Sequence, residues 1–159
     1  PFIPLLETAA GVALVAEILA GPRPAEVYFG LNDLSLDLGR DFMFEPLAEG
    51  MLDAPAALLC AAGVPFGLGG VARVGTGAVP AELVLGEHVR LGSDRVILSR
   101  GFHDRAATVA EMRQNLDFRG ELSALKAAYA AHTRADPGHL AQNRAAFQAA
   151  VAAVAAKMR

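Results

Sequence analysis

Short apolar runs alternate with longer stretches of helical periodicity along the first two thirds of the chain. The apolar runs cover residues 2–6, 27–30, 64–68 and 95–98, and each predicts a β-strand. Helical spacing or alanine- and leucine-rich composition marks residues 9–20, 46–62 and 80–91 between them. Strands that are apolar throughout and separated by helices are typical of a parallel sheet covered by helices. The pattern therefore predicts an α/β fold.

Capping and breaking residues support the same division. Thr8 is the expected N-cap of the first helix, and Gly21-Pro22 ends that helix. Pro80 is expected in the first turn of the helix before the fourth strand, and Gly92 ends it.

The C-terminal third has a different pattern. Residues 120–133 and 139–158 are expected to form two helices joined by the turn Asp136-Pro137-Gly138. Apolar residues form one stripe along the second helix, which packs either on this chain's own domain or on another subunit. The members of the stripe are Leu140, Phe147, Val151, Val154 and Met158. We divide the chain into residues 1–105, with the strands, and residues 106–159, with the C-terminal helices and a possible role in oligomerisation.

Four parallel strands form either an open sheet or part of a barrel. The common (β/α)8 barrel has eight strands and needs about 250 residues. The first predicted strand begins almost at residue 1. This favours one half of a barrel, with the other half in a further segment or in another polypeptide.

Composition excludes several classes of protein. Of the 159 residues, 53% are hydrophobic and 19% are charged, so we expect a large buried core and no intrinsic disorder. The net charge of −3 and the absence of a lysine or arginine cluster argue against a nucleic-acid partner. The single cysteine, Cys60, cannot form an internal disulfide, so a reducing compartment such as the cytoplasm is expected.

Two apolar stretches invite comparison with membrane or targeting segments. Residues 9–20 are too few to span a bilayer and contain Glu17, and no basic region precedes them as in a secretory signal. Residues 54–72 are uncharged, but glycine and proline divide them into shorter pieces. We therefore expect a helix and a buried strand, and no membrane partner.

Polar side chains gather where the predicted strands end. The carboxyl ends of parallel strands lie at one edge of a sheet, where such folds build their sites. The polar residues there are Glu7, Thr8, Asn32, Asp33, Arg73, Ser99, Arg100 and His103. They are therefore expected to converge on one face of the domain.

Glu7 and Asp33 lie about one βα repeat apart, so they are expected to leave neighbouring strands and approach a shared point. Two carboxylates repel each other unless a cation lies between them, and oxygen ligands suit Mg²⁺ or Mn²⁺. The structural alternative is that Glu7 caps a helix together with Thr8, and that Asp33 forms a turn with Asn32. Spacing alone leaves both interpretations open.

Other possible sites are less specific. Gly67 to Ala72 formally matches the relaxed dinucleotide pattern G-x-G-x-x-A, but it comes at the third strand rather than in a first βαβ unit. A backbone loop that binds phosphate or carboxylate, or a tight turn, explains these glycines better. His88, His132 and His139 lie in or beside predicted helices and are expected to be surface or partly buried residues.

Two motifs resemble those of the HpcH/HpaI aldolase/citrate lyase family, whose members are pyruvate- and phosphoenolpyruvate-utilising barrels. The first is Leu5-Leu6-Glu7-Thr8, followed by Gly11-Val12 and Glu17-Ile18. The second is Gly-Leu-Asn-Asp-Leu-Ser-Leu-Asp-Leu-Gly at residues 30–39. The resemblance continues more loosely through residues 65–70 and 97–100, and so covers roughly residues 1–105.

The resemblance implies the second half of a TIM (β/α)8 barrel with trailing helices, in a homo-oligomer. Glu7 and Asp33 would bind Mg²⁺ or Mn²⁺, while Leu31 and Asn32 would lie near the substrate carboxylate. We place Gly69 and Gly70, in the glycine-rich loop, among the substrate-binding residues. The implied activity is that of a carbon–carbon lyase, in which the metal holds a pyruvate-like group and stabilises the enolate. The implied substrate is an oxo-acid or an acyl-coenzyme A thioester.

The resemblance assigns no catalytic residue in this chain. The family's enolate-stabilising arginine and its histidine base belong to the first half of the barrel, and Arg73, Arg100 and His103 do not match their positions. We therefore expect this chain alone to be an incomplete enzyme. Two further interpretations are a phosphoenolpyruvate-dependent phosphotransfer barrel and a non-catalytic half-barrel that acts as an assembly module.

Overall fold

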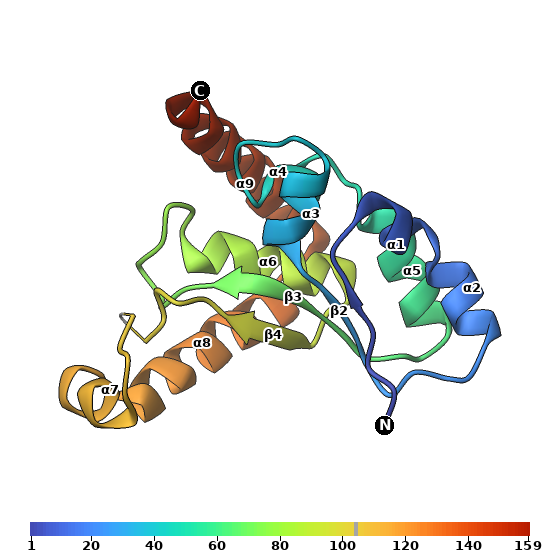
Figure 1. Ribbon diagram of the computed structural model, residues 1–159. Helices are drawn as coiled ribbons and strands as arrows, with labels where there is room; N and C mark the ends of the chain where they lie inside the picture. The colour runs from blue at the N-terminus through green and yellow to red at the C-terminus, as the bar shows by residue number, and fades with distance from the viewer. Residues whose placement is uncertain (104) are drawn as a thin grey trace.

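The computed structural model describes residues 1–103 and 105–159, and its centre is a sheet of four parallel strands (Figure 1). The strands are β1 (Leu5–Leu6), β2 (Val27–Phe29), β3 (Phe66–Val71) and β4 (Arg95–Leu98). They lie side by side in chain order, β1-β2-β3-β4. The prediction of an α/β fold with a parallel sheet is confirmed.

Helices connect these strands. They are α1 (Ala9–Ala13), α2 (Val15–Ala20), α3 (Leu31–Asp37), α4 (Glu45–Ala48), α5 (Asp53–Ala61) and α6 (Ala81–Leu91). Helix α6 packs against β3, and α2 packs against α5 on the other side of the molecule in Figure 1. Thr8 caps α1 by accepting a hydrogen bond from the Gly11 amide, as the sequence predicts.

The register of the sheet brings large apolar side chains into one core. Val27 pairs with Phe66, and Phe29 pairs with Leu68. The rings of Phe29 and Phe66 meet edge to face at 6.1 Å between centroids, and both are fully buried. Leu31 and Leu34 of α3 join the same core, so the helix that follows β2 is held against the sheet.

The C-terminal region forms α7 (Val109–Asn115), α8 (Phe118–Thr133) and α9 (Pro137–Met158). Phe147 and Val151, from the apolar stripe predicted for the last helix, are buried. Helix α9 packs against α4 and α6. Of the two interpretations of the stripe, packing on the chain's own domain is the one observed.

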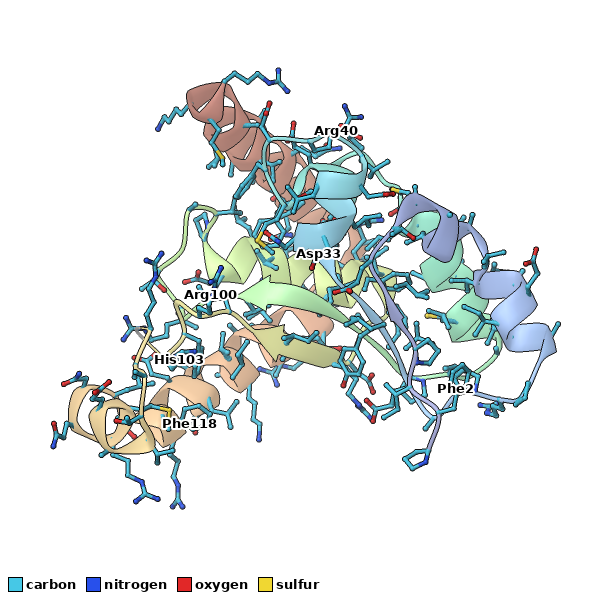
Figure 2. The ribbon with its side chains drawn as sticks, in the orientation of Figure 1. Phe2, Asp33, Arg40, Arg100, His103 and Phe118 are labelled. Carbon is cyan, nitrogen blue, oxygen red and sulfur yellow. The ribbon has the colours of Figure 1, made fainter. Side chains whose placement is uncertain are left out.

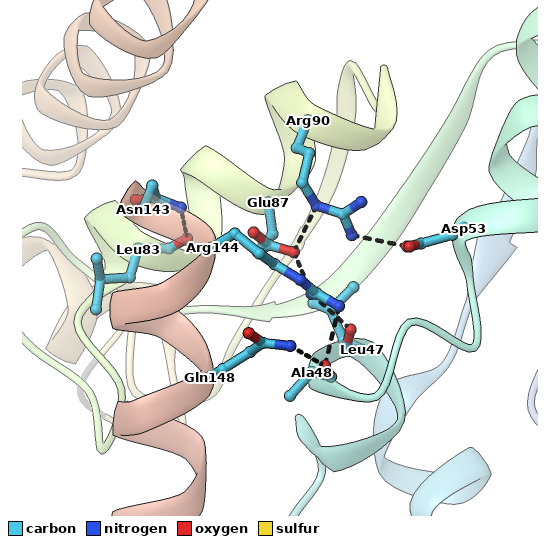
Figure 3. A network of polar contacts seen from close by, with 9 residues as sticks. All are labelled: Leu47, Ala48, Asp53, Leu83, Glu87, Arg90, Asn143, Arg144 and Gln148. Carbon is cyan, nitrogen blue, oxygen red and sulfur yellow. Dashed lines mark hydrogen bonds and ion pairs between the residues drawn. The ribbon is translucent and has the colours of Figure 1, made fainter. Parts of the chain in front are cut away.

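Buried polar contacts reinforce this packing of α9 (Figure 3). The fully buried Glu87 of α6 accepts hydrogen bonds from Arg144 Nη1 at 2.6 Å and from Arg90 Nε at 2.9 Å. Arg144 also donates to the carbonyl oxygens of Leu47 and Ala48, each at 2.9 Å. One guanidinium of α9 is therefore bonded to both α4 and α6.

The element boundaries differ from the predicted ones in two stretches of helical pattern. The expected helix over 46–62 is divided into α4 and α5, because Pro55 lacks an amide proton and is tolerated only near a helix start. The expected first helix is divided at Leu14. Within the described part of the chain, no helix has the length and apolar character required to cross a membrane.

Candidate functional site

The carboxyl ends of the strands form one continuous edge. The Gly30 amide after β2 donates to the Leu6 carbonyl of β1 at 3.0 Å, and the Ser99 amide after β4 donates to the Val71 carbonyl of β3 at 2.8 Å. These bonds extend the pairing of each strand just beyond its end. The residues that follow the strands are thereby held next to one another, as the parallel arrangement requires.

A cavity of about 300 Å³ opens at this edge. It is lined from the ends of β2, β3 and β4 and from the start of α3, and Figure 2 shows Asp33 and Arg100 at this end of the sheet. The lining residues are Gly30, Leu31, Asn32, Asp33, Met43, Gly69, Gly70, Ile97, Leu98, Ser99 and Arg100. Five residues predicted for the site, Leu31, Asn32, Asp33, Gly69 and Gly70, thus share one cavity.

Glu7 lies beside this cavity and does not line it directly. Its side chain rests on Gly30, where a Cβ atom would stand only 2.5 Å from Glu7 Oε1. Gly30 lines the cavity and precedes Asp33 by one turn of chain. The missing side chain at Gly30 therefore gives the Glu7 carboxylate its place next to the segment that carries Asp33.

Both carboxylates lack protein partners in residues 1–103 and 105–159, since neither makes a hydrogen bond or an ion pair there. Thr8 caps α1 with its own hydroxyl, so Glu7 does not serve as the cap. Asp33 lies in the first turn of α3 without a capping bond. The structural roles that the sequence left open for these two side chains are therefore not the ones observed.

The donor set suits a hard divalent cation. Among the described residues, no cluster of three or more histidine, cysteine, aspartate or glutamate side chains is arranged to hold a metal. Mg²⁺ is commonly bound by one or two carboxylates with water at its other positions. Within residues 1–103 and 105–159, two carboxylates without partners next to a cavity are compatible with that mode of binding, and Gly30 leaves room for the Glu7 side chain.

The glycines after the middle of β3 expose backbone to the same cavity. Gly70 has φ +94°, and a Cβ atom there would lie 2.6 Å from Met43 Cε. The pairing of β3 with β4 is irregular between Gly69 and Val71. Neither a left-handed backbone nor so close a neighbour suits a side chain, so this position requires glycine.

The other polar residues predicted near the strand ends do not all reach the cavity. Ser99 and Arg100 line the cavity, whereas Arg73 and His103 are not among its described lining residues. The Arg73 Nε atom is buried and has no hydrogen-bond partner in the described part of the chain. The structure thus brings Arg100, and not His103, into the region of Asp33.

His88 is a fully buried polar residue, so its expected surface or partly buried position was wrong. Its Nδ1 lies 3.0 Å from Ser93 Oγ, which donates to the Phe66 carbonyl at 3.0 Å. Burial lowers the pKa of His88 to about 4. The signal available in the sequence was its spacing with Leu85 and Leu91, which places all three on the buried face of α6.

His88 and Ser93 also line a second cavity of about 220 Å³ between α6, β4 and α8. A serine–histidine contact resembles part of a nucleophilic site, but both side chains are fully buried and the serine hydroxyl is bonded to backbone carbonyls. Nucleophilic attack needs a hydroxyl that reaches the substrate. We assign this pair a structural role, which joins α6 to the start of β4.

Comparisons of the chain with protein-family models, with curated proteins and with solved structures found no match.

Proposed function

We propose that the chain is part of a metal-dependent carbon–carbon lyase of the aldolase/citrate lyase type. The observation that carries this proposal is a pair of carboxylates, Glu7 and Asp33, at the carboxyl edge of a parallel sheet and beside one cavity, which find no partner among the described residues. The resemblance of residues 1–105 to the HpcH/HpaI family gives the pair its proposed chemistry.

Glu7 and Asp33 would bind Mg²⁺ or Mn²⁺ through their oxygens. A divalent ion bound there supplies Lewis-acid stabilisation of negative charge on the oxo and carboxylate oxygens of a pyruvate-like group. Leu31 and Asn32 would position the substrate carboxylate from the start of α3. Gly69 and Gly70, which lack side chains, would let the substrate approach the backbone of β3.

The sheet supports the finer proposal of a half-barrel. Four parallel strands in chain order, with helices between them, are the arrangement of one half of a (β/α)8 barrel. We assign no catalytic acid or base to this chain, because the proposal takes those groups from the other half of the barrel. That half would come from a further segment or from another polypeptide.

The cavity suits a small substrate. A volume of about 300 Å³ is at the lower end of the range for ligand pockets. A small oxo-acid would occupy such a cavity, whereas the coenzyme A portion of an acyl-coenzyme A thioester would extend beyond it. Cys60 as the single cysteine supports a cytoplasmic setting for this chemistry.

Homo-oligomer formation is also part of the proposal. Large apolar side chains are exposed at both edge strands of the sheet: Leu5 of β1 at 51%, Val96 of β4 at 38% and Ile97 of β4 at 41%. An unpaired strand edge with exposed apolar side chains favours association with another chain.

Calorimetric titration with Mn²⁺, with and without oxalate as a pyruvate-like chelator, tests the metal site. We expect binding that oxalate strengthens and that is lost in Glu7→Gln and in Asp33→Asn. Glu17→Gln, which removes an exposed carboxylate of α2, is the matched control and should bind like the wild type. Binding that is absent, or equal in all variants, would remove the basis of the lyase proposal.

A further inference from the structure

Two histidine side chains face each other at the corner between α8 and α9. His132 lies in the last turn of α8 and His139 in the first turn of α9. The His139 Nε2 and His132 Nδ1 atoms are 3.3 Å apart, and the ring centroids are 5.2 Å apart. This corner belongs to the C-terminal helices and shares no residue with the cavity beside Asp33.

Each ring offers one nitrogen to the contact between them. Burial lowers the pKa of His132 and so favours its neutral form. In a neutral pair, one of the two facing nitrogens donates a proton and the other accepts it, and the tautomers of the rings decide which.

The backbone around the pair is well fixed. Asp136 caps α9 by accepting a hydrogen bond from the His139 amide at 2.9 Å. Thr133 Oγ1 donates to the Tyr129 carbonyl at 3.0 Å in the last turn of α8. The His132 ring is half-buried, and the His139 ring is exposed and can turn.

Negative charge lies close to the pair. The Glu82 carboxylate acts on His132 through its charge and favours a cation at that position. Its Oε1 atom accepts a hydrogen bond from the Gly75 amide at 3.0 Å, whereas Oε2 is buried and has no partner among the described residues. A cation at the histidine pair would compensate part of the charge of this partly buried carboxylate.

We propose that His132 and His139 form a binding site for a transition-metal ion of the zinc class, separate from the carboxylate pair of Glu7 and Asp33. Two imidazole nitrogens bound to one tetrahedral Zn²⁺ at about 2.0–2.1 Å lie roughly 3.3 Å from each other. The observed separation of Nε2 and Nδ1 is 3.3 Å. Imidazole ligands select zinc, copper or nickel, whereas carboxylates select magnesium or manganese, so the two sites differ in chemistry.

Binding changes the protonation of one ring. The ion occupies the place of the proton between the two nitrogens, so the ring that carried this proton moves it to its other nitrogen and remains neutral. Since the described residues offer no third side-chain ligand, water completes the coordination and the affinity is moderate.

Calorimetric titration of the untagged chain with Zn²⁺, in a Cys60→Ser background that excludes thiol binding, tests the proposal. We expect one Zn²⁺ per chain, with affinity reduced by about tenfold or more in His132→Ala and in His139→Ala. His103→Ala is the matched histidine control and should retain the wild-type affinity. The double variant Glu7→Gln/Asp33→Asn should also retain it, which separates this site from the proposed lyase site.

Histidine nitrogen NMR provides the second readout. In the Zn²⁺-bound state, His139 should carry its proton on Nδ1 and His132 on Nε2, because the other nitrogen of each ring binds the ion. Zn²⁺ binding that survives both alanine variants, no binding at all, or a different tautomer of either ring in the bound state would each overturn the proposal.

Discussion

At the scale of single residues, the candidate site depends on a glycine, because a side chain at Gly30 would collide with Glu7. Glu7 Oε1 occupies space next to Gly30 that a methyl group would fill. No motif rule predicts this close approach from the sequence, because it follows from the register between β1 and β2, in which Leu6 pairs with Phe29. The position of both residues near strand ends was predictable, since Glu7 directly follows one apolar run and Asp33 comes three residues after the next.

Replacement of Gly30 by alanine should weaken Mn²⁺ binding without removing a ligand. Gly30 has φ −88°, which alanine adopts without strain, so the new methyl group acts only by displacing the Glu7 carboxylate. We expect the Mn²⁺ affinity in calorimetry to fall between about 10- and 100-fold, as for loss of a residue that orients a ligand.

Gly21→Ala is the matched control, because Gly21 also has an ordinary φ and its nearest neighbour would be 3.6 Å from the new Cβ. Equal Mn²⁺ affinity in the Gly30→Ala and Gly21→Ala variants would show that the contact between the Glu7 side chain and Gly30 has no part in metal binding.

His88 should make the chain less stable as the pH falls. Its pKa is 6.5 in the unfolded chain and about 4 in the fold, so between these values the unfolded state binds more protons. The stabilisation that the neutral His88 contributes to the fold is fully present above pH 6.5 and is lost as the pH falls towards 4. We expect the free energy of unfolding to drop by about 2 kcal/mol between pH 7 and pH 5 on account of this residue.

Denaturant unfolding at both pH values, for the wild type and for His88→Asn, measures that contribution. The asparagine amide can replace Nδ1 as the donor to Ser93 Oγ but does not titrate. Between pH 7 and pH 5, the free energy of unfolding should fall by about 2 kcal/mol less in His88→Asn than in the wild type. An identical fall in both proteins would contradict the buried neutral state of His88.

At the scale of elements, the sequence predicted strands better than the helices beside the site. The apolar run at 95–98 corresponds to β4 residue for residue. Helix α3 was not predicted, because Asn32 and Asp33 favour turns by local chemistry. In the fold, burial of Leu31 and Leu34 against the sheet outweighs that local preference. The position of Asp33 on a helix is therefore a consequence of tertiary packing.

Arg144 should be needed to attach α9 to the domain. Arg144→Leu leaves the fully buried Glu87 with Arg90 as its remaining ionic partner and removes one hydrogen bond from each of two carbonyls of α4. Removal of one member of a buried ion pair costs about 3 kcal/mol or more. Denaturant unfolding should show a loss of that size.

Arg40→Leu tests whether that loss is specific to a buried pair, because Arg40 and Glu49 form an exposed pair at 2.8 Å. An exposed pair contributes about 1 kcal/mol or less. Similar losses in the two variants would contradict the importance assigned to the Glu87–Arg144 contact.

At the scale of the whole molecule, the two edges of the sheet are its least protected features. The parallel order of the strands was predictable from four apolar runs separated by helices. The sequence did not predict which apolar side chains remain exposed, because exposure depends on what covers each edge of the sheet. Val96 and Ile97 are apolar by sequence, yet they lie on an edge strand that pairs on one side in the described structure.

The isolated chain should self-associate through these edges. Sedimentation velocity should show concentration-dependent oligomers, and Leu5→Lys combined with Val96→Lys should reduce them, because lysine on an edge strand opposes pairing. Leu36→Lys, a change at an exposed apolar position of α3 away from the edge strands, is the control and should leave association unchanged. A monodisperse wild-type monomer at high concentration would contradict this prediction.

The most direct test of the account is to locate Mn²⁺ by paramagnetic broadening of assigned backbone amide signals. If the carboxylate pair binds the ion, the signals of Glu7, Gly30 and Asp33 should broaden first, while those of α9 near Val151 remain sharp. The same signals should remain sharp in the Glu7→Gln/Asp33→Asn variant. Broadening that is centred elsewhere, or that persists unchanged in this variant, would show that the two carboxylates do not bind the metal.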